Sequence, residues 1–210
     1  DTNGQLLHSP FPSRDMYYTI GDAYPCPIDI DGDGQDELAV TRLESSNGIE
    51  SVVLVLLDGN LEVLARHSLT SDGNISPLLV KTPPRAADLD GDGLPEVLVD
   101  LFNVGVQAID PRTGEVLWTF PYPQREPLAF LLTADLNLDG ADEVLFGAGP
   151  AGQLEIFAIS GDGTLFTGTG NAVWPRRFGY ESDFVTAALG DSNYDRYPEL
   201  LLSVTSRYSK

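Results

Sequence analysis

Four acidic segments of nine residues, each followed by an apolar run, constrain the fold of this chain more than any other feature. They read DIDGDGQDE at residues 29–37, DLDGDGLPE at 88–96, DLNLDGADE at 135–143 and DSNYDRYPE at 191–199. Their intervals of 59, 47 and 56 residues indicate one supersecondary unit repeated along the chain. The architecture should therefore be a repeat of that unit.

The segments around each acidic loop predict what the unit contains. A short β-like run precedes each loop, and an apolar run follows it directly, as in LAV from residue 38 and VLVDLF from residue 97. Further β-rich arms at 51–69, 104–122 and 152–166 each contain a turn signal, which is typical of a hairpin. One unit is thus a strand, an acidic loop, a strand and a hairpin, or four antiparallel strands in all.

We expect an all-β chain with very little helix, because no stretch of ten or more residues has a 3.6-residue apolar period. Four-stranded sheets repeated at this interval favour β-propeller blades over a sandwich, which would not explain a loop at the same place in every unit. Residues 1–210 are expected to be a single domain with about four repeats, either a small ring or part of a larger propeller. The repeat phase suggests that the chain begins late in one blade and ends early in another.

The charge of the chain is strongly negative and unevenly distributed. There are 32 acidic residues against 12 Lys and Arg, a net charge of −20, and 16 of the acids lie in the four segments. Clustered carboxylates repel one another unless a cation lies among them, so the pattern predicts a bound cation. The shortage of basic residues argues against nucleic-acid binding. No apolar run approaches the ~20 residues of a membrane helix, so we expect no membrane insertion in this segment.

The spacing of the oxygen-bearing residues suggests calcium, which takes six to eight hard oxygen ligands. In a tight turn, side chains at positions 1, 3 and 5 can face one centre, position 7 can offer its main-chain carbonyl, and the carboxylate at position 9 closes the shell. In the first two loops these roles fall on Asp29, Asp31, Asp33, Gln35 and Glu37, and on Asp88, Asp90, Asp92, Leu94 and Glu96. In the last two loops they fall on Asp135, Asn137, Asp139, Ala141 and Glu143, and on Asp191, Asn193, Asp195, Tyr197 and Glu199.

The fourth loop departs from the others at position 6, where Arg196 replaces glycine. We expect calcium in the first three loops, and the occupancy of the fourth is left open. An EF-hand would need a glutamate at position 12, but that position holds Val40, Val99, Phe146 or Leu202. Magnesium is disfavoured because its octahedral shell usually keeps several waters. A single loop could also be a turn built from Asp, Asn and Gly, but four loops in phase argue against that.

The nine-residue pattern followed by an LAV-like strand resembles the FG-GAP repeat of integrin α-subunit propellers. It is closer still to the related VCBS-type repeats of bacterial surface and secreted proteins. The resemblance extends over nearly the whole chain, and segments such as AIDPRTGEVLWTF match the later strands of such blades. It implies a calcium-binding propeller, usually of about seven blades, that serves adhesion or ligand binding.

We therefore expect a non-catalytic module of an extracellular, secreted or cell-surface protein of bacterial type. Its partner would be a protein or carbohydrate ligand at the cell surface, and incomplete blades could also pair with other copies to give a head-to-tail filament. The alternative is the propeller part of a calcium-dependent carbohydrate-active enzyme of the polysaccharide lyase kind. That reading needs a basic or histidine cluster, and the chain offers only Arg176 and Arg177 as an adjacent pair, with His8 and His67 as its two histidines.

Overall fold

A computed structural model describes residues 25–46, 49–69, 82–101, 104–122, 128–149, 153–168, 173–179 and 184–205. These residues form 14 β-strands and no helix, so none of them belongs to a helix that could cross a membrane. The first two units contain β1 (Cys26–Ile28), β2 (Glu37–Ser46), β3 (Ile49–Leu57), β4 (Val63–Ser68), β5 (Arg85–Ala87), β6 (Glu96–Leu101), β7 (Gly105–Ile109) and β8 (Val116–Phe120). The third and fourth contain β9 (Phe130–Ala134), β10 (Glu143–Ala148), β11 (Gln153–Ile159), β12 (Arg176–Gly179), β13 (Phe184–Gly190) and β14 (Glu199–Thr205).

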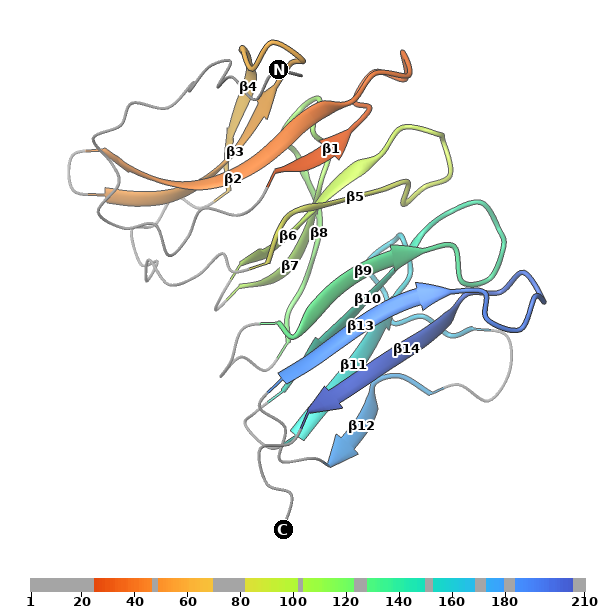
Figure 1. The fold of residues 1–210 in the computed structure, drawn as a ribbon. Coiled ribbons are helices and arrows are strands. Elements are labelled where there is room, and N and C mark those ends of the chain that lie inside the picture. The colour runs from red at the N-terminus through yellow and green to blue at the C-terminus, as the bar shows by residue number, and fades with distance from the viewer. Residues whose placement is uncertain are drawn as a thin grey trace, which may run out of the picture.

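The strands form one antiparallel sheet per unit, in chain order. β1 to β4, β5 to β8 and β9 to β12 each make a four-stranded sheet, and β13 pairs with β14. The all-β class and the four-stranded antiparallel unit are therefore confirmed. The first strands β1, β5, β9 and β13 lie next to one another in that order (Figure 1). The sheets described here do not close into a ring.

The third unit differs from the sequence prediction in its last strand. The arm after the turn at residues 160–163 was expected to be that strand, but only Leu165 pairs there, with Ile159. The fourth strand of the sheet is instead β12, whose Arg176 to Gly179 lie opposite Ile156 to Gln153. The two ends of β11 thus have different partners: Leu165 and Phe166 bond to its last residues, and β12 pairs with its first four.

The hydrophobic core lies between successive sheets. Val97, Val99 and Leu101 of β6 share a buried cluster with unit 1, whereas Leu98 on the opposite face shares one with unit 3. A strand that is buried on both faces needs an uninterrupted apolar run, since its side chains alternate between the faces. This explains why apolar runs, and not alternating patterns, follow the acidic loops.

Polar contacts between units hold the hairpin turns in place. The indole Nε1 of Trp118 on β8 donates to the carbonyl of Gly161, 2.7 Å away in the turn of unit 3. His67 Nε2 on β4 lies 2.9 Å from the carbonyl of Pro111, in the turn of unit 2. Each of these turns therefore contacts the fourth strand of the preceding unit.

A buried carboxylate of unit 2 connects three separate segments of the chain. Asp100 on β6 accepts hydrogen bonds from the hydroxyl of Tyr122 at 2.5 Å and from that of Thr82 at 3.2 Å. It also accepts one from the backbone of Leu128. Burial raises the pKa of Asp100, and the three donors act in the opposite direction. The side chain thus fixes the segments that enter β5, leave β8 and enter β9.

Candidate metal centres

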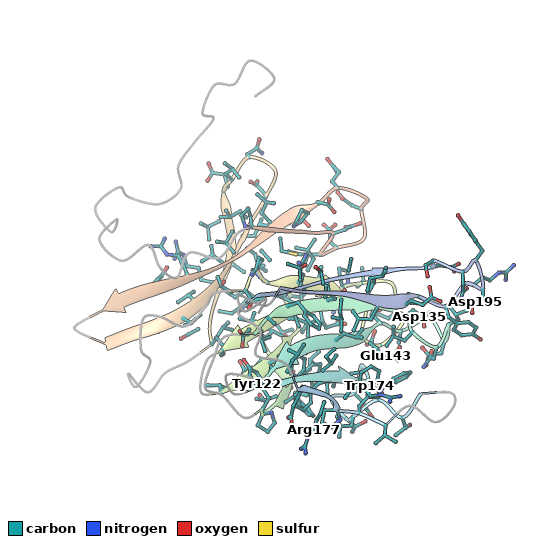
Figure 2. All side chains as sticks on the ribbon, turned by 60° about the horizontal axis from the view of Figure 1, so that its bottom comes forward. Tyr122, Asp135, Glu143, Trp174, Arg177 and Asp195 are labelled. Carbon is teal, nitrogen blue, oxygen red and sulfur yellow. The ribbon has the colours of Figure 1, made fainter. Side chains whose placement is uncertain are left out.

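The four acidic segments occupy the same place in every unit, between the first and second strands. We name them loop 1 (residues 29–37), loop 2 (88–96), loop 3 (135–143) and loop 4 (191–199). All four lie along one side of the molecule, at the right of Figure 1. Figure 2 shows Asp135 and Glu143 of loop 3 near Asp195 of loop 4 at that same end. The repeat in the sequence thus becomes a row of acidic loops.

All four loops have the same backbone form, with left-handed residues at positions 4 and 6. Position 6 has φ values of 84°, 87°, 99° and 79° at Gly34, Gly93, Gly140 and Arg196. Position 4 has φ values of 75°, 75°, 63° and 66° at Gly32, Gly91, Leu138 and Tyr194. Loop 4 therefore keeps the turn although Arg196 replaces glycine, at the conformational cost that a side chain adds in this region.

The loop conformation is held by side-chain oxygens that accept main-chain N–H groups; all are carboxylate oxygens except the amide oxygens at position 3 of loops 3 and 4. The side chain at position 1 accepts the N–H of position 6 at 2.9 to 3.0 Å in all four loops. Position 3 accepts from position 5, and position 5 accepts from position 7, at 2.8 to 3.2 Å. These bonds place the side chains of positions 1, 3 and 5 around one centre.

The glutamate at position 9 closes each loop from the start of the second strand. Its Oε2 accepts the N–H of position 2 at 3.1, 3.0, 2.8 and 2.7 Å in loops 1 to 4. Glu96 and Glu143 are buried, each 2% exposed. Burial raises the pKa of both carboxyls, and neighbouring acids raise it further, to about 7 for Glu143. A cation placed among these groups would reverse that effect, since it favours the ionised form.

Three loops bring carboxylate oxygens close enough to share a cation. The groups are Asp29, Asp31 and Asp33 in loop 1, Asp88, Asp90 and Glu96 in loop 2, and Asp191, Asp195 and Glu199 in loop 4, each with its ligand atoms within 4.8 Å of one another. Loop 3, although fully described, has no such trio of carboxylates. A donor set made only of oxygen fits calcium. The main-chain carbonyls of Gln35, Leu94, Ala141 and Tyr197 remain predicted ligands.

Loops 3 and 4 differ from loops 1 and 2 at position 3, where asparagine replaces aspartate. Asn137 Nδ2 donates to Asp139 Oδ2 at 2.9 Å and to Glu143 Oε1 at 3.3 Å. Asn193 Nδ2 donates to Asp195 at 3.1 Å and to Glu199 at 2.7 Å. The amide hydrogens thus satisfy carboxylate oxygens that are predicted cation ligands, while each amide oxygen accepts the N–H of position 5.

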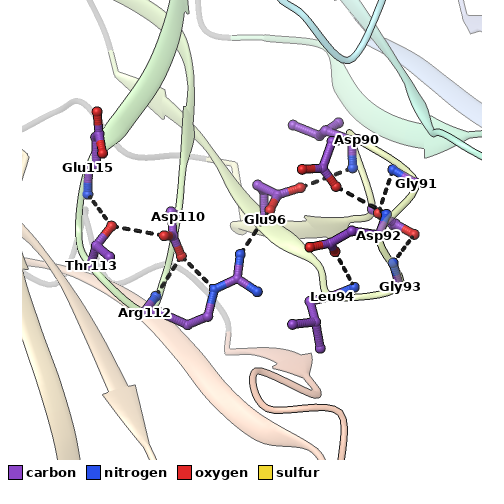
Figure 3. Close-up of polar contacts among 12 residues, drawn as sticks. Asp90, Gly91, Asp92, Gly93, Leu94, Glu96, Asp110, Arg112, Thr113 and Glu115 are labelled. Carbon is purple, nitrogen blue, oxygen red and sulfur yellow. Dashed lines mark hydrogen bonds and ion pairs between the residues drawn. The ribbon is translucent and has the colours of Figure 1, made fainter.

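Loop 2 has a basic neighbour that the sequence did not reveal. Arg112, in the turn between β7 and β8, places Nη2 3.3 Å from Glu96 Oε1 and Nε 2.8 Å from Asp110 Oδ1 (Figure 3). In the sequence Arg112 lies inside the turn signal DPRTG, with no pattern that connects it to Glu96 16 residues earlier. Arg112 thus supplies positive charge beside the closing carboxylate of loop 2.

Successive antiparallel β-sheets, each with an oxygen-lined acidic loop between its first two strands, define a repeat protein with candidate cation sites. Residues 29–99 match the family model of the FG-GAP-like repeat, so the resemblance seen in the sequence is confirmed over that part of the chain. The match contains loop 1, loop 2 and the strands between them. No curated protein matches the chain. Among solved structures, the V. cholerae biofilm matrix protein Bap1 is similar at 17% identity and a TM-score of 0.32, over 67% of this chain and 27% of that chain.

Proposed function

We propose that this chain is part of an extracellular calcium-binding β-propeller with a non-catalytic role in adhesion, ligand binding or assembly. The observation that carries the proposal is a single hydrogen-bonded loop form that recurs four times on one side of a stack of sheets. In each loop, side-chain oxygens that could bind a metal face a common centre. In loops 1, 2 and 4 three carboxylates approach within 4.8 Å. Such groups repel one another without a cation, and calcium is the common cation that accepts a crowded oxygen shell.

The propeller arrangement is supported by how successive sheets pack. Each first strand lies beside the first strand of the next unit, and cores fill the space between sheets on both faces. Blades around an axis pack in this way, with their first strands innermost. We propose that the described units are successive blades, and that bound calcium makes the connection between the two inner strands of each blade rigid.

Thermal unfolding with and without calcium tests the structural role of the ion. An ion at 100 times its dissociation constant stabilises the folded state by about 2.7 kcal/mol, or roughly 5 to 10 °C for a domain of this size. Calorimetry should show a higher melting temperature in calcium than in excess EGTA, with a smaller effect of magnesium. An Asp88→Asn, Asp90→Asn variant, which disables loop 2, should lose part of the increase. An unchanged melting curve in EGTA would contradict the proposal.

A non-catalytic role is part of the same proposal. In the described part of the chain, the one histidine, His67, contacts the carbonyl of Pro111. Arg177, half of the only adjacent arginine pair, has Nε 2.6 Å from Glu155 Oε1. The lyase-like alternative predicts that the protein releases unsaturated, ultraviolet-absorbing products from acidic polysaccharides. Their appearance at a rate that depends on Arg176 and Arg177 would replace the binding role by an enzymatic one.

Self-association through incomplete units also stays a prediction. Within the residues described, the fourth unit consists of β13 and β14, and β14 pairs only with β13. Light scattering at high protein concentration in calcium should then report species larger than a monomer. A constant monomer mass under those conditions would rule out assembly by this route.

A further inference from the structure

Loops 2 and 3 are joined directly by hydrogen bonds in both directions. The N–H of Asp142 donates to the carbonyl of Asp88 at 2.7 Å, and the N–H of Asp88 donates to Oδ2 of Asp142 at 3.3 Å. Asp142 also receives a hydrogen bond from the backbone of Asp135. Asp88 and Asp135 are the first residues of loops 2 and 3, so one carboxylate holds the backbone of both.

The two loops also approach each other closely without side chains between them. A Cβ added at Gly91 of loop 2 would lie 3.3 Å from the carbonyl oxygen of Gly140 in loop 3. Asp88 in turn shapes loop 2, because its carboxylate accepts the N–H groups of Gly91 and Gly93, both at 2.9 Å. Displacement of Asp142 would therefore be transmitted to the centre of loop 2 through Asp88.

The other two junctions between neighbouring loops lack this connection for a chemical reason. Asp142 occupies position 8 of loop 3, and the same position is Pro95 in loop 2 and Pro198 in loop 4. Proline has no N–H group and no acceptor on its side chain, so neither residue can form the two-way contact. Between loops 1 and 2 the contact is apolar, with Leu94 Cδ2 3.0 Å from a Cβ built on Gly32.

We propose that Asp142 is a positioning residue that couples loops 2 and 3, so that calcium in either loop raises the calcium affinity of the other. This inference rests on the proposed calcium binding. An ion in loop 3 would order the residues on both sides of Asp142, which then holds Asp88 in the form that loop 2 needs. The second ion meets a loop that is already ordered, which gives positive cooperativity. Loops 1 and 4 bind independently.

The test uses a protein in which only loops 2 and 3 can bind. The substitutions that disable the other loops are Asp29→Asn, Asp31→Asn, Asp191→Asn and Asp195→Asn. Titration calorimetry should report two calcium ions bound with a Hill coefficient above 1. Further inactivation of loop 3 with Asp135→Asn and Asp139→Asn should weaken binding at loop 2 by about fivefold, in the range of ordinary coupling between sites.

Two variants at residue 142 separate coupling from charge. Asp142→Pro introduces the residue that loops 2 and 4 already have at position 8, and it should leave two ions bound without cooperativity. Asp142→Asn keeps an acceptor and the N–H group, and it should keep the cooperativity. If far-UV circular dichroism shows that Asp142→Pro does not fold, Asp142→Ala, which keeps the N–H but loses the acceptor, should show reduced cooperativity.

A protein with only loops 1 and 2 intact is the matched control, and it should bind two ions independently. Three outcomes would overturn the coupling while leaving calcium binding intact. They are cooperativity that survives in Asp142→Pro, independent binding of the two ions to loops 2 and 3, and a single ion bound to those two loops. Absence of calcium binding in the unmodified chain would instead overturn the proposed function.

Discussion

Loops 1 and 2 have the same backbone form as loops 3 and 4 but carry different residues at positions 3 and 4. The first pair has aspartate at position 3 and glycine at position 4, whereas the second pair has asparagine at position 3 and Leu138 or Tyr194 at position 4. Leu138 and Tyr194 nevertheless keep positive φ values of 63° and 66°. The hydrogen-bonded frame is thus kept whether position 3 is aspartate or asparagine and whether position 4 is glycine or a larger residue.

This difference suggests that the two pairs of loops bind calcium with different strength. Loops 1 and 2 contribute four carboxylates each at positions 1, 3, 5 and 9, and loops 3 and 4 contribute three. The number of charged ligands is one of the factors that set calcium affinity. Arg196, the residue that made loop 4 doubtful in the sequence, leaves the backbone of the loop in the common form. Asn193, in contrast, removes one of the carboxylates that loops 1 and 2 have.

The largest expected effect comes from exchanging position 3 between the pairs. Asp90→Asn should lower the calcium affinity of loop 2 by about tenfold, or ~1.4 kcal/mol, because it removes one charged ligand. Asn137→Asp should raise the affinity of loop 3 by a similar factor. Calorimetric titration of each variant against the unmodified chain measures both. Equal affinities in all three proteins would remove position 3 as the cause of the difference.

A smaller effect is expected from relieving the left-handed arginine in loop 4. Arg196→Gly should stabilise the calcium-free protein by about 1 kcal/mol, the cost of a side chain in this region of φ. Urea unfolding measures the change, and Gly34→Ala in loop 1 is the converse variant, which should be destabilising. If Arg196→Gly lowers the stability, then Arg196 makes a compensating contact.

The smallest effect is expected at Arg112, whose side chain is 33% exposed and lies beside Glu96. Arg112→Gln should raise the calcium affinity of loop 2 by about twofold, or ~0.4 kcal/mol, because partly exposed ion pairs are weak and the guanidinium competes with the cation. Arg66→Gln is the control, since Arg66 pairs with Glu44 away from the loops. A lower affinity after Arg112→Gln would mean that Arg112 orients Glu96 for binding.

The sequence was sufficient for features that depend on local pattern. The loop positions, the strands on either side and the hairpins at 51–69 and 104–122 follow from turn residues and apolar runs, and β3, β4, β7 and β8 confirm the hairpins. The last strand of unit 3 could not be located, because the short pairing of Leu165 is indistinguishable in sequence from the start of a strand.

Contacts between residues far apart in the chain could not be predicted from the sequence. Arg112 lies beside Glu96 because the β7–β8 turn folds back toward the start of β6, and Asp142 meets Asp88 because two units stack. Neither residue differs from an ordinary turn or loop residue when it is read in its own segment. The orientation of Asn137 toward Glu143 likewise depends on the closure of the loop by the second strand.

The bonds that hold each loop have a consequence for protein engineering. In every loop, positions 1, 3, 5 and 9 accept N–H groups that belong to the same nine residues. A segment held in this way carries much of its own folding information, and two neighbouring antiparallel strands support its ends. The best graft is DIDGDGQDE of loop 1, since loop 2 has proline at position 8 and so gives loop 1 no contact like that of Asp142 with Asp88. Placed in a hairpin of an unrelated β-protein, this segment should keep its shape and respond to cations.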